Sequence, residues 1–197
     1  MGNSRYFSKF RNILIASIVP FVLLAIWEWA VSTGVIPNTI IASPSQVVRN
    51  FFELLFNGQL LIHSSVSLFR FLIGFALGSF LGLLFGVVVG VSKLGERLIA
   101  PTIGLFAPIP PIAWIPLLII FFGIGEGSKI GLIAIASAVV IYISTVQGIR
   151  SVDQKLIEVA KSYNKSTKDL LIKVLLPSAI PNILTGMRVA LGLSWIL

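Results

Sequence analysis

The amino-acid sequence predicts an all-α membrane protein: a polytopic bundle of membrane-crossing helices with one polar helix–turn–helix segment. Hydrophobic residues make up 56% of the 197 residues and charged residues only 11%, and the mean hydropathy is +1.00. Several charge-free runs approach 20 residues, the length that an α-helix needs to cross a bilayer. A soluble domain of this size needs no such composition, so we treat residues 1–197 as a single transmembrane domain.

The first span is predicted over residues 13–31, and only Glu28 interrupts this apolar run. A signal peptide would have a shorter apolar core followed by a small-residue cleavage site, which this stretch lacks. Trp27 and Trp29 flank Glu28 and fit an aromatic belt at the membrane surface. The flanking aromatic residues favour an interfacial position for this carboxylate over a buried functional one.

A polar interval over residues 32–64 contains one predicted helix. Ser43 can cap this helix, and Pro44 suits its first turn, because the N–H that proline lacks has no helical partner there. His63 is the one histidine, and without carboxylate or cysteine neighbours it is a poor metal ligand or catalytic base. The apolar residues of the helix predict that it lies partly in the membrane interface: Val47, Val48, Phe51, Phe52, Leu54 and Leu55.

A second span is predicted over residues 71–91, a run of 21 residues without a charge. Glycine recurs in it at every fourth position, and such small residues let helix backbones approach closely within a membrane. We therefore expect this face to pack tightly inside the bundle: Gly74, Gly78, Gly82, Gly86 and Gly90.

A third span is predicted over residues 98–122, and its prolines exclude a straight helix, because each one removes a backbone donor and obstructs the preceding turn. Irregular backbone at membrane depth is tolerated only where protein or a water-filled cavity covers it. Two interpretations stay open, a kinked helix and the lining of a translocation pathway. The pathway candidates are Pro108, Pro110, Pro111, Trp114 and Pro116.

Two further spans are predicted over residues 130–149 and 178–197, the latter containing Arg188. Residues 150–177 lie between these two spans and form a polar loop, which holds six of the 15 Lys and Arg residues. It predicts two short helices separated by a stop at Asn164, a residue that tolerates the left-handed conformation. In the first helix, Ser151 and Gln154 form a predicted capping box, and Val152, Leu156 and Tyr163 are apolar positions. In the second helix, Ser166 or Thr167 is the predicted cap, and Pro177 is the predicted stop. The apolar positions of the second helix are Leu170, Leu171, Val174 and Leu175.

The distribution of Lys and Arg predicts a cytoplasmic N-terminus. Residues 1–12 hold three, residues 92–97 hold two and residues 150–173 hold six, so eleven lie on one side. Only Arg49 and Lys129 fall on the other side. Positive charge collects on the cytoplasmic face of membrane proteins, which places the polar loop in the cytoplasm. The net charge of +8 thus reflects topology, and no nucleic-acid partner is expected.

The sequence offers no catalytic or metal site. It contains no cysteine, which excludes thiol catalysis and cysteine-ligated metals. A membrane enzyme needs a cluster of His, Asp, Glu or Cys, and none is present. Gly123–Lys129 resembles a phosphate-binding loop superficially, but the order Gly-Ser-Lys differs from the required Gly-Lys-Ser/Thr.

The polar loop resembles the "EAA" loop of binding-protein-dependent ABC importer permeases. The family pattern is Glu-Ala-Ala, three residues, Gly, nine residues, then Ile-x-Leu-Pro, and every spacing matches here. Val159 replaces Ala, Asn164 replaces Gly and Val174 replaces Ile. The resemblance implies that the loop docks on an ATPase through Glu158, Val159, Ala160, Asn164, Val174, Leu176 and Pro177. The alternative is a solvated loop folded back on its own bundle.

The resemblance extends over most of the chain and is nearest to the nitrate/sulfonate/taurine/bicarbonate branch of the family. Ile109–Ile112 and Leu184–Leu193 carry the branch resemblance. It implies a type I importer permease of the cell inner membrane that pairs with a second copy as a homodimer. Two ATPase subunits, which bind ATP and Mg, and an external solute-binding protein would complete the assembly. No cofactor is expected in this chain.

The alternative function is a stand-alone channel or secondary transporter. A secondary transporter usually needs ionisable groups inside the membrane for ion coupling, and here only Glu28 and Arg188 qualify. Members of the resembled family continue for a further span or more. We therefore expect the 197-residue chain to be truncated at its C-terminus, and in this form neither to dimerise stably nor to support uptake.

Overall fold

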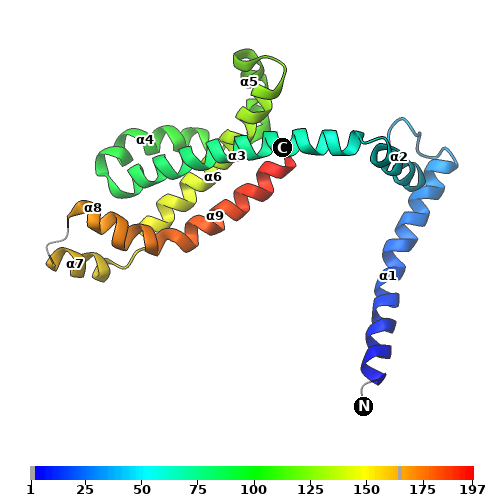
Figure 1. Ribbon diagram of the computed structural model, residues 1–197, viewed down its shortest axis with the longest axis horizontal. Coiled ribbons are helices and arrows are strands. Elements are labelled where there is room, and N and C mark those ends of the chain that lie inside the picture. The colour runs from blue at the N-terminus through cyan, green and yellow to red at the C-terminus, as the bar shows by residue number, and fades with distance from the viewer. Residues whose placement is uncertain (1–2, 164–165) are drawn as a thin grey trace. The chain divides into compact units, whose positions relative to one another are not determined.

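The computed structural model describes residues 3–163 and 166–197, and every regular element within these ranges is a helix (Figure 1). The chain forms two compact units, Met1–Ser65 and Val66–Leu197. The first unit contains α1 (Asn3–Ser32), α2 (Pro44–Phe56) and the start of α3 (Gln59–Val91). The second contains the rest of α3 and then α4 (Lys93–Phe106), η1 (Pro111–Trp114), α5 (Ile115–Phe122), α6 (Glu126–Arg150), α7 (Gln154–Ser162), α8 (Thr167–Leu170), η2 (Leu171–Leu175) and α9 (Leu176–Ile196).

Four helical stretches of the described chain are long and apolar enough to cross a membrane: Ile15–Ser32, Gln59–Val91, Glu126–Arg150 and Leu171–Ile196. A fifth candidate is the bent pair formed by α4 and the segment Pro111–Phe122. These stretches confirm the predicted all-α, polytopic fold class. Helix α3 extends the predicted span 71–91 toward the N-terminus, because the polar residues before Phe71 continue the helix without a break.

In the first unit, the start of α2 is fixed by two sets of hydrogen bonds. The Ser43 hydroxyl accepts from the Gln46 N–H at 3.3 Å, and the Gln46 side chain accepts from the Ser43 N–H at 3.3 Å. This reciprocal capping box confirms Ser43 as the predicted cap. The Glu28 carboxylate accepts from the N–H and the hydroxyl of Ser45 at 2.9 and 2.8 Å. A carboxylate at a helix N-terminus is stabilised by the helix dipole, so Glu28 joins α1 to α2.

In the second unit, the glycines of α3 face α6 at very short range (Figure 1). A Cβ on Gly82 would lie 2.6 Å from the backbone oxygen of Ala138, and one on Gly86 would lie 2.6 Å from Cβ of Thr145. No real Cβ approaches an atom so closely, so glycine is required at these contacts. The predicted tight packing of this face is confirmed.

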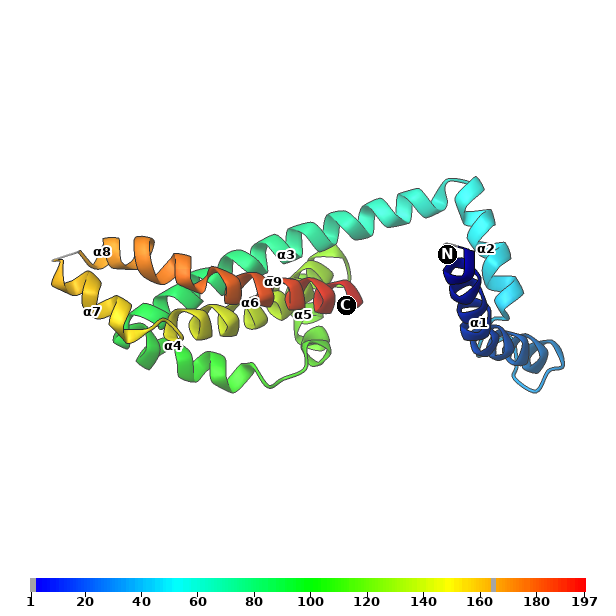
Figure 2. The same cartoon turned by 90° about the horizontal axis from the view of Figure 1, so that it is seen from below.

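Helix α9 packs against α6 on its other side, and Figure 2 shows the two helices running side by side. Ile141 of α6 and Ala179 and Ala190 of α9 are completely buried. The small side chains permit the close approach, because a Cβ on Gly148 would lie 3.0 Å from Cβ of Asn182. Helices α3, α6 and α9 therefore form the core of this unit.

The proline-rich segment breaks its helix completely. Helix α4 ends at Phe106, a short 3-10 turn follows at Pro111–Trp114, and the two arms meet at a bend of 94°. The exclusion of a straight helix is confirmed. A bend of this size is a broken span or a re-entrant loop, and it is far larger than the kink that one proline produces.

Two of the predicted ends of the polar helices need correction, the cap at Ser151 and the stop at Pro177. Ser151 does not cap α7; its hydroxyl donates to the Gly148 carbonyl at 2.9 Å and so belongs to the end of α6. Asp153 caps α7 instead, since its carboxylate accepts from the Lys155 N–H at 2.9 Å. Ser166 caps α8 as predicted, because its hydroxyl accepts from the Asp169 N–H at 3.2 Å.

Pro177 does not end the second polar helix. The backbone continues from α8 through the π-helical turn η2 into α9, and the Leu176 N–H donates to the Leu171 carbonyl. This wider turn resolves the conflict between a helix and the proline, since Pro177 then occupies the first turn of α9, where no N–H is needed. The second polar helix and the last span are one continuous element.

Candidate functional site

Helices α7 and α8 form a helix pair at the end of the second unit where α6 ends and α9 begins (Figure 1). Large apolar side chains remain exposed on this pair: Leu156 is 50% exposed, Tyr163 74% and Ile172 61%. The sequence placed Leu156 and Tyr163 on one apolar stripe, and the structure leaves both of them exposed. Ile157 takes the inward position on α7 instead.

The base of the helix pair is a hydrophobic cluster shared with the core helices. Ile149 from α6 and Ala179 from α9 are buried there with Val152 and Leu175. The side chains packed around them come from four helical elements and the π turn: Leu83, Val87, Ile157, Leu170, Leu171, Val174 and Met187. The predicted apolar side of the second polar helix is confirmed. The pair is therefore anchored on α6 and α9 at its base, and its tip stays open.

The structure divides the predicted coupling residues into two groups. Glu158 and Pro177 are exposed, while Val174 packs against the cluster and Leu176 is half-buried. Asn164 lies outside the described residues, as do the side chains of Val159 and Ala160. Their packing stays a prediction. Val174 packs the pair against the bundle, and Glu158 is the charged residue of the motif.

Two ion pairs of the described side chains lie at this end. Arg150 donates to Glu96 at 2.8 Å and joins α6 to the start of α4, and Lys173 pairs with Asp169 at 2.6 Å. Glu158 is in none of the ion pairs of the described side chains. The hydroxyl of Ser162 donates to the Glu158 backbone carbonyl and does not involve the carboxylate. The sequence did not predict the Arg150–Glu96 pair, because the two residues are far apart along the chain.

The predicted pathway residues also separate in space. Pro111 and Trp114 line a cavity of about 120 Å³ together with Val139 and Val140 of α6 and Leu193 of α9. Trp114 packs edge-to-face on Phe106, with ring centroids 5.5 Å apart. Pro108, Pro110 and Pro116 are exposed and lie outside this cavity. The break in the helix thus seats one face of the segment on the core and leaves the other uncovered.

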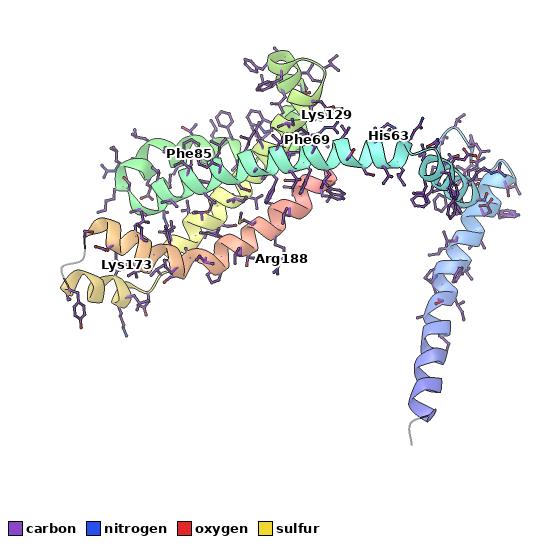
Figure 3. All side chains as sticks on the ribbon, in the orientation of Figure 1. His63, Phe69, Phe85, Lys129, Lys173 and Arg188 are labelled. Atoms are coloured by element: carbon purple, nitrogen blue, oxygen red, sulfur yellow. The ribbon has the colours of Figure 1, made fainter. Side chains whose placement is uncertain are left out.

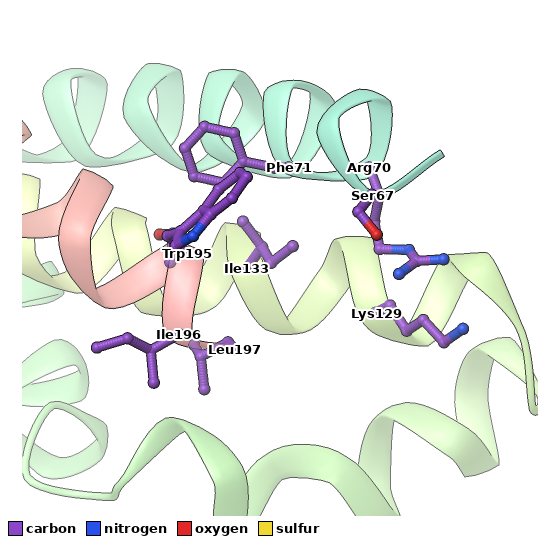
Figure 4. Close-up of a pocket in the computed structure, with 9 residues that line it drawn as sticks. Ser67, Arg70, Phe71, Lys129, Ile133, Trp195, Ile196 and Leu197 are labelled. Atoms are coloured by element: carbon purple, nitrogen blue, oxygen red, sulfur yellow. The ribbon is translucent and has the colours of Figure 1, made fainter. Parts of the chain in front are cut away.

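A larger cavity of about 390 Å³ lies at the opposite end of the unit, beside Arg70, Lys129 and Trp195 (Figure 4). Arg70 donates two hydrogen bonds to Glu126 at 2.6 and 2.7 Å, and Lys129 donates a third at 3.3 Å. Both cations therefore share one carboxylate, and the cluster keeps one net positive charge. This cluster was not predicted from the sequence, since Arg70 and Glu126 lie on different helices.

Comparisons with known proteins agree with this arrangement. Residues 71–197 match the family described as "Binding-protein-dependent transport system inner membrane component". SsuC of Bacillus subtilis is named as an aliphatic sulfonates transport permease protein. It is 40% identical to this chain over 91% of this chain and 65% of its own length. The taurine transport system permease protein TauC of Escherichia coli is 36% identical over 88% of this chain and 65% of its own length. The chain thus spans about two thirds of the length of these relatives.

A solved structure supports the fold. An inward-facing conformation of the MetNI methionine ABC transporter is similar with a TM-score of 0.56 over 65% of this chain and 66% of that chain. The sequence identity is 23%, so the similarity concerns the fold alone. It agrees with the importer-permease fold that the sequence predicted.

Proposed function

We propose, because this chain belongs to the family of binding-protein-dependent transport system inner membrane components, that it acts as the transmembrane permease subunit of an ATP-driven importer. It would form part of the translocation path and couple to a separate ATPase. The chain itself would carry out no chemical reaction, and ATP with Mg would bind on the partner.

The observation that carries this proposal is the exposed tip of the helix pair. A loop folded back on its own bundle would bury its large apolar side chains, yet Leu156, Tyr163 and Ile172 remain exposed. Glu158 adds a carboxylate that is in no described ion pair. Exposed aromatic and aliphatic residues around an unpaired charge are typical of a surface that binds another protein.

The contacts at the base of the pair provide a mechanical path into the membrane helices. Ile157 of α7 packs against the cluster that contains Ile149 of α6 and Ala179 of α9. The continuous backbone from α8 to α9 gives a second connection. When a docked ATPase closes on ATP and moves the pair, α6 and α9 would move with it. This motion would switch access from the outer to the inner side.

The broken segment around Pro108–Pro116 is the proposed lining of the path. Its backbone between Phe106 and Pro111 lies outside regular helix, and such backbone at membrane depth requires a protein or water-filled surrounding. Pro108, Pro110 and Pro116 would face the route, while Pro111 and Trp114 would seat the segment on the core.

The proposed cargo is a small anion or a sulfur- or nitrogen-containing organic compound. SsuC and TauC are named for the transport of aliphatic sulfonates and taurine, and the sequence resembles the nitrate/sulfonate/taurine/bicarbonate branch. We further propose a homodimer of permeases, two ATPase subunits and an external solute-binding protein. The assembly would lie in the cell inner membrane with the N-terminus and the helix pair in the cytoplasm, as the distribution of Lys and Arg favours.

Substitutions in the helix pair test the coupling. Glu158→Ala removes a charge-assisted hydrogen bond to the ATPase, which is worth about 1.5–3 kcal/mol and corresponds to roughly 10- to 100-fold weaker docking. Ala160→Trp should block close approach of the partner. We expect both variants, made in the complete permease and present at normal membrane levels, to lose ATPase co-purification and ATP-driven uptake.

Glu53→Ala is the matched control, because Glu53 is also an exposed glutamate on a helix and belongs to no coupling motif. It should leave both measurements unchanged. If Glu158 only interacted within α7, its removal would cost a few tenths of a kcal/mol and docking would hardly change. Normal docking and uptake by both helix-pair variants would show that the helix pair is not the coupling element and would remove the main support for the importer assignment.

A further inference from the structure

Arg188 is a charged residue on the open face of α9. The buried face of α9, formed by Ala179, Ile183, Gly186, Ala190 and Ser194, packs against the core. At 3.6 residues per turn, Arg188 lies about 160° from the centre of that face. Figure 3 shows its side chain on the side of α9 that is turned away from α6, and the residue is exposed.

The packing of α9 on α6 gives the depth of Arg188 in the membrane. A Cβ on Gly186 would contact Ser144 of α6, and one on Gly82, the middle glycine of the α3 series, would lie 3.0 Å from Cβ of Ile141. Gly148 contacts Ala179, so the two helices are antiparallel. Arg188 therefore lies near the level of Ile141, about 5 Å from the middle of α6 at 1.5 Å per residue.

A lipid-facing position is physically unfavourable at this depth. The hydrocarbon core extends about 15 Å to either side of the bilayer centre, so the guanidinium lies far from either surface. Ionised groups at such depth face the bundle interior or a water-filled cavity and pair with an opposite charge. Arg188 is in none of the ion pairs of the described side chains. Among the described side chains of the second unit, Arg188 therefore has no acidic partner.

On one side of Arg188 the helix surface is small or polar, while the exposed side chains of Leu184 and Leu191 flank its other side. Pro181, Thr185, Arg188 and Gly192 follow one another at spacings of four, three and four residues, which places them on one stripe. The Thr185 hydroxyl donates to the Pro181 carbonyl at 2.9 Å and is exposed. A Cβ on Gly192 would have no neighbour within 4 Å. The stripe thus leaves open space beside the guanidinium and a hydroxyl close to it.

We propose that Arg188 projects into the water-filled translocation route and binds the oxyanion group of the transported substrate. This inference rests on the proposed importer function and assigns its substrate class to anions with a sulfonate-like group. The planar guanidinium presents parallel N–H donors that match two oxygens of such a group. At mid-depth, the guanidinium of Arg188 would replace part of the water that the anion loses as it crosses.

The absence of cysteine from the chain permits a direct test by chemical modification. Arg188→Cys is introduced into the complete permease, which is assembled with its ATPase and binding protein in proteoliposomes. We expect at least a 10-fold loss of ethanesulfonate uptake. Reaction with the positively charged aminoethyl methanethiosulfonate should restore uptake several-fold, whereas the negatively charged sulfonatoethyl reagent should not. Ethanesulfonate should slow both modifications.

Two single-cysteine variants on α9 serve as matched controls. Thr185→Cys lies on the same stripe and should react with both reagents. Ala190→Cys is on the completely buried face and should stay unmodified. Failure of Arg188→Cys to react while Thr185→Cys reacts would overturn the proposal, and so would equal rescue by both reagents. Either result would leave the importer function intact.

Arg188→Gln separates substrate binding from assembly. We expect ATPase co-purification and basal ATP hydrolysis to remain within two-fold of the unsubstituted complex while ethanesulfonate uptake falls at least 10-fold. Parallel loss of assembly and uptake would instead identify Arg188 as a contact between subunits and overturn the proposal. If the unsubstituted complex imports neither ethanesulfonate, taurine nor nitrate, the proposed cargo is wrong; the cysteine reactivities still decide whether Arg188 faces water.

Discussion

At the scale of single residues, the contact between α3 and α6 depends on glycines, which have no side chain to separate the two backbones. A Cβ on Gly78 would collide with the Ser137 side chain and the Ala134 carbonyl. Ser137 cannot move freely, because its buried hydroxyl donates to the Ile133 carbonyl at 2.7 Å. Gly104, also within a helix, has open space where its Cβ would be. The two glycines therefore form a matched pair with opposite expectations.

We predict that Gly78→Ala destabilises the protein and Gly104→Ala does not. Overpacking a close contact costs about 1–3 kcal/mol, which outweighs the gain of about 0.8–1 kcal/mol from replacing glycine in a helix. At Gly104 only the gain remains. Thermal unfolding of both variants in detergent should give a lower midpoint for Gly78→Ala and an equal or higher one for Gly104→Ala. Equal midpoints for the two variants would contradict the α3–α6 packing.

At the scale of elements, the start of α7 distinguishes the sequence prediction from the structure. Sequence rules favour Ser151 as the cap, whereas Asp153 accepts from the Lys155 N–H and Ser151 closes the end of α6. Asn182 of α9 also donates to the Ser151 hydroxyl at 3.1 Å. Ser151 thus has a tertiary role that its local sequence does not reveal.

We predict that Asp153→Ala loosens the first turn of α7 while Ser151→Ala leaves it intact. Loss of an N-cap costs about 1 kcal/mol, or roughly a five-fold change in an equilibrium constant. Hydrogen exchange of the Lys155 and Leu156 amides should therefore accelerate about five-fold in Asp153→Ala. Faster exchange of these amides in Ser151→Ala, with none in Asp153→Ala, would restore the capping that the sequence predicted.

At the scale of the whole molecule, the eleven Lys and Arg residues on one side define the proposed orientation. Tyr163 at the tip of the helix pair is 74% exposed and should be accessible only from the cytoplasm. Gln59, at the start of α3, and Gly125, just before α6, should be accessible only from outside. Gln59 and Gly125 each bound a helix that is long and apolar enough to span the membrane, whereas Tyr163 lies between the short helices α7 and α8.

We predict the labelling pattern of three single-cysteine variants in intact cells. A membrane-impermeant maleimide should label Gln59→Cys and Gly125→Cys, and it should label Tyr163→Cys only after the membrane is opened. Residues 1–197 contain no cysteine, so they contribute no background labelling. Labelling of Tyr163→Cys from outside would invert the topology and exclude docking on a cytoplasmic ATPase.

The sequence by itself determined the features that depend on local chemistry. Long apolar runs predicted the membrane helices, the spacing of glycines predicted the tight face of α3, and clustered prolines predicted the broken segment. The Ser43 and Ser166 caps also followed from their neighbours, because a cap satisfies backbone donors only two or three residues away. The coupling motif was visible for the same reason, since its spacing lies within one polar loop.

Only the tertiary structure decided which side chains face which neighbours. The polar helices could present either face to the bundle, and packing against Ile149 and Ala179 selected Ile157 and left Tyr163 exposed. The π turn before Pro177 and the pairing of Arg150 with Glu96 likewise depend on residues from different helices. Helical periodicity defines the faces of a helix, but the burial of apolar surface against a particular partner chooses among them.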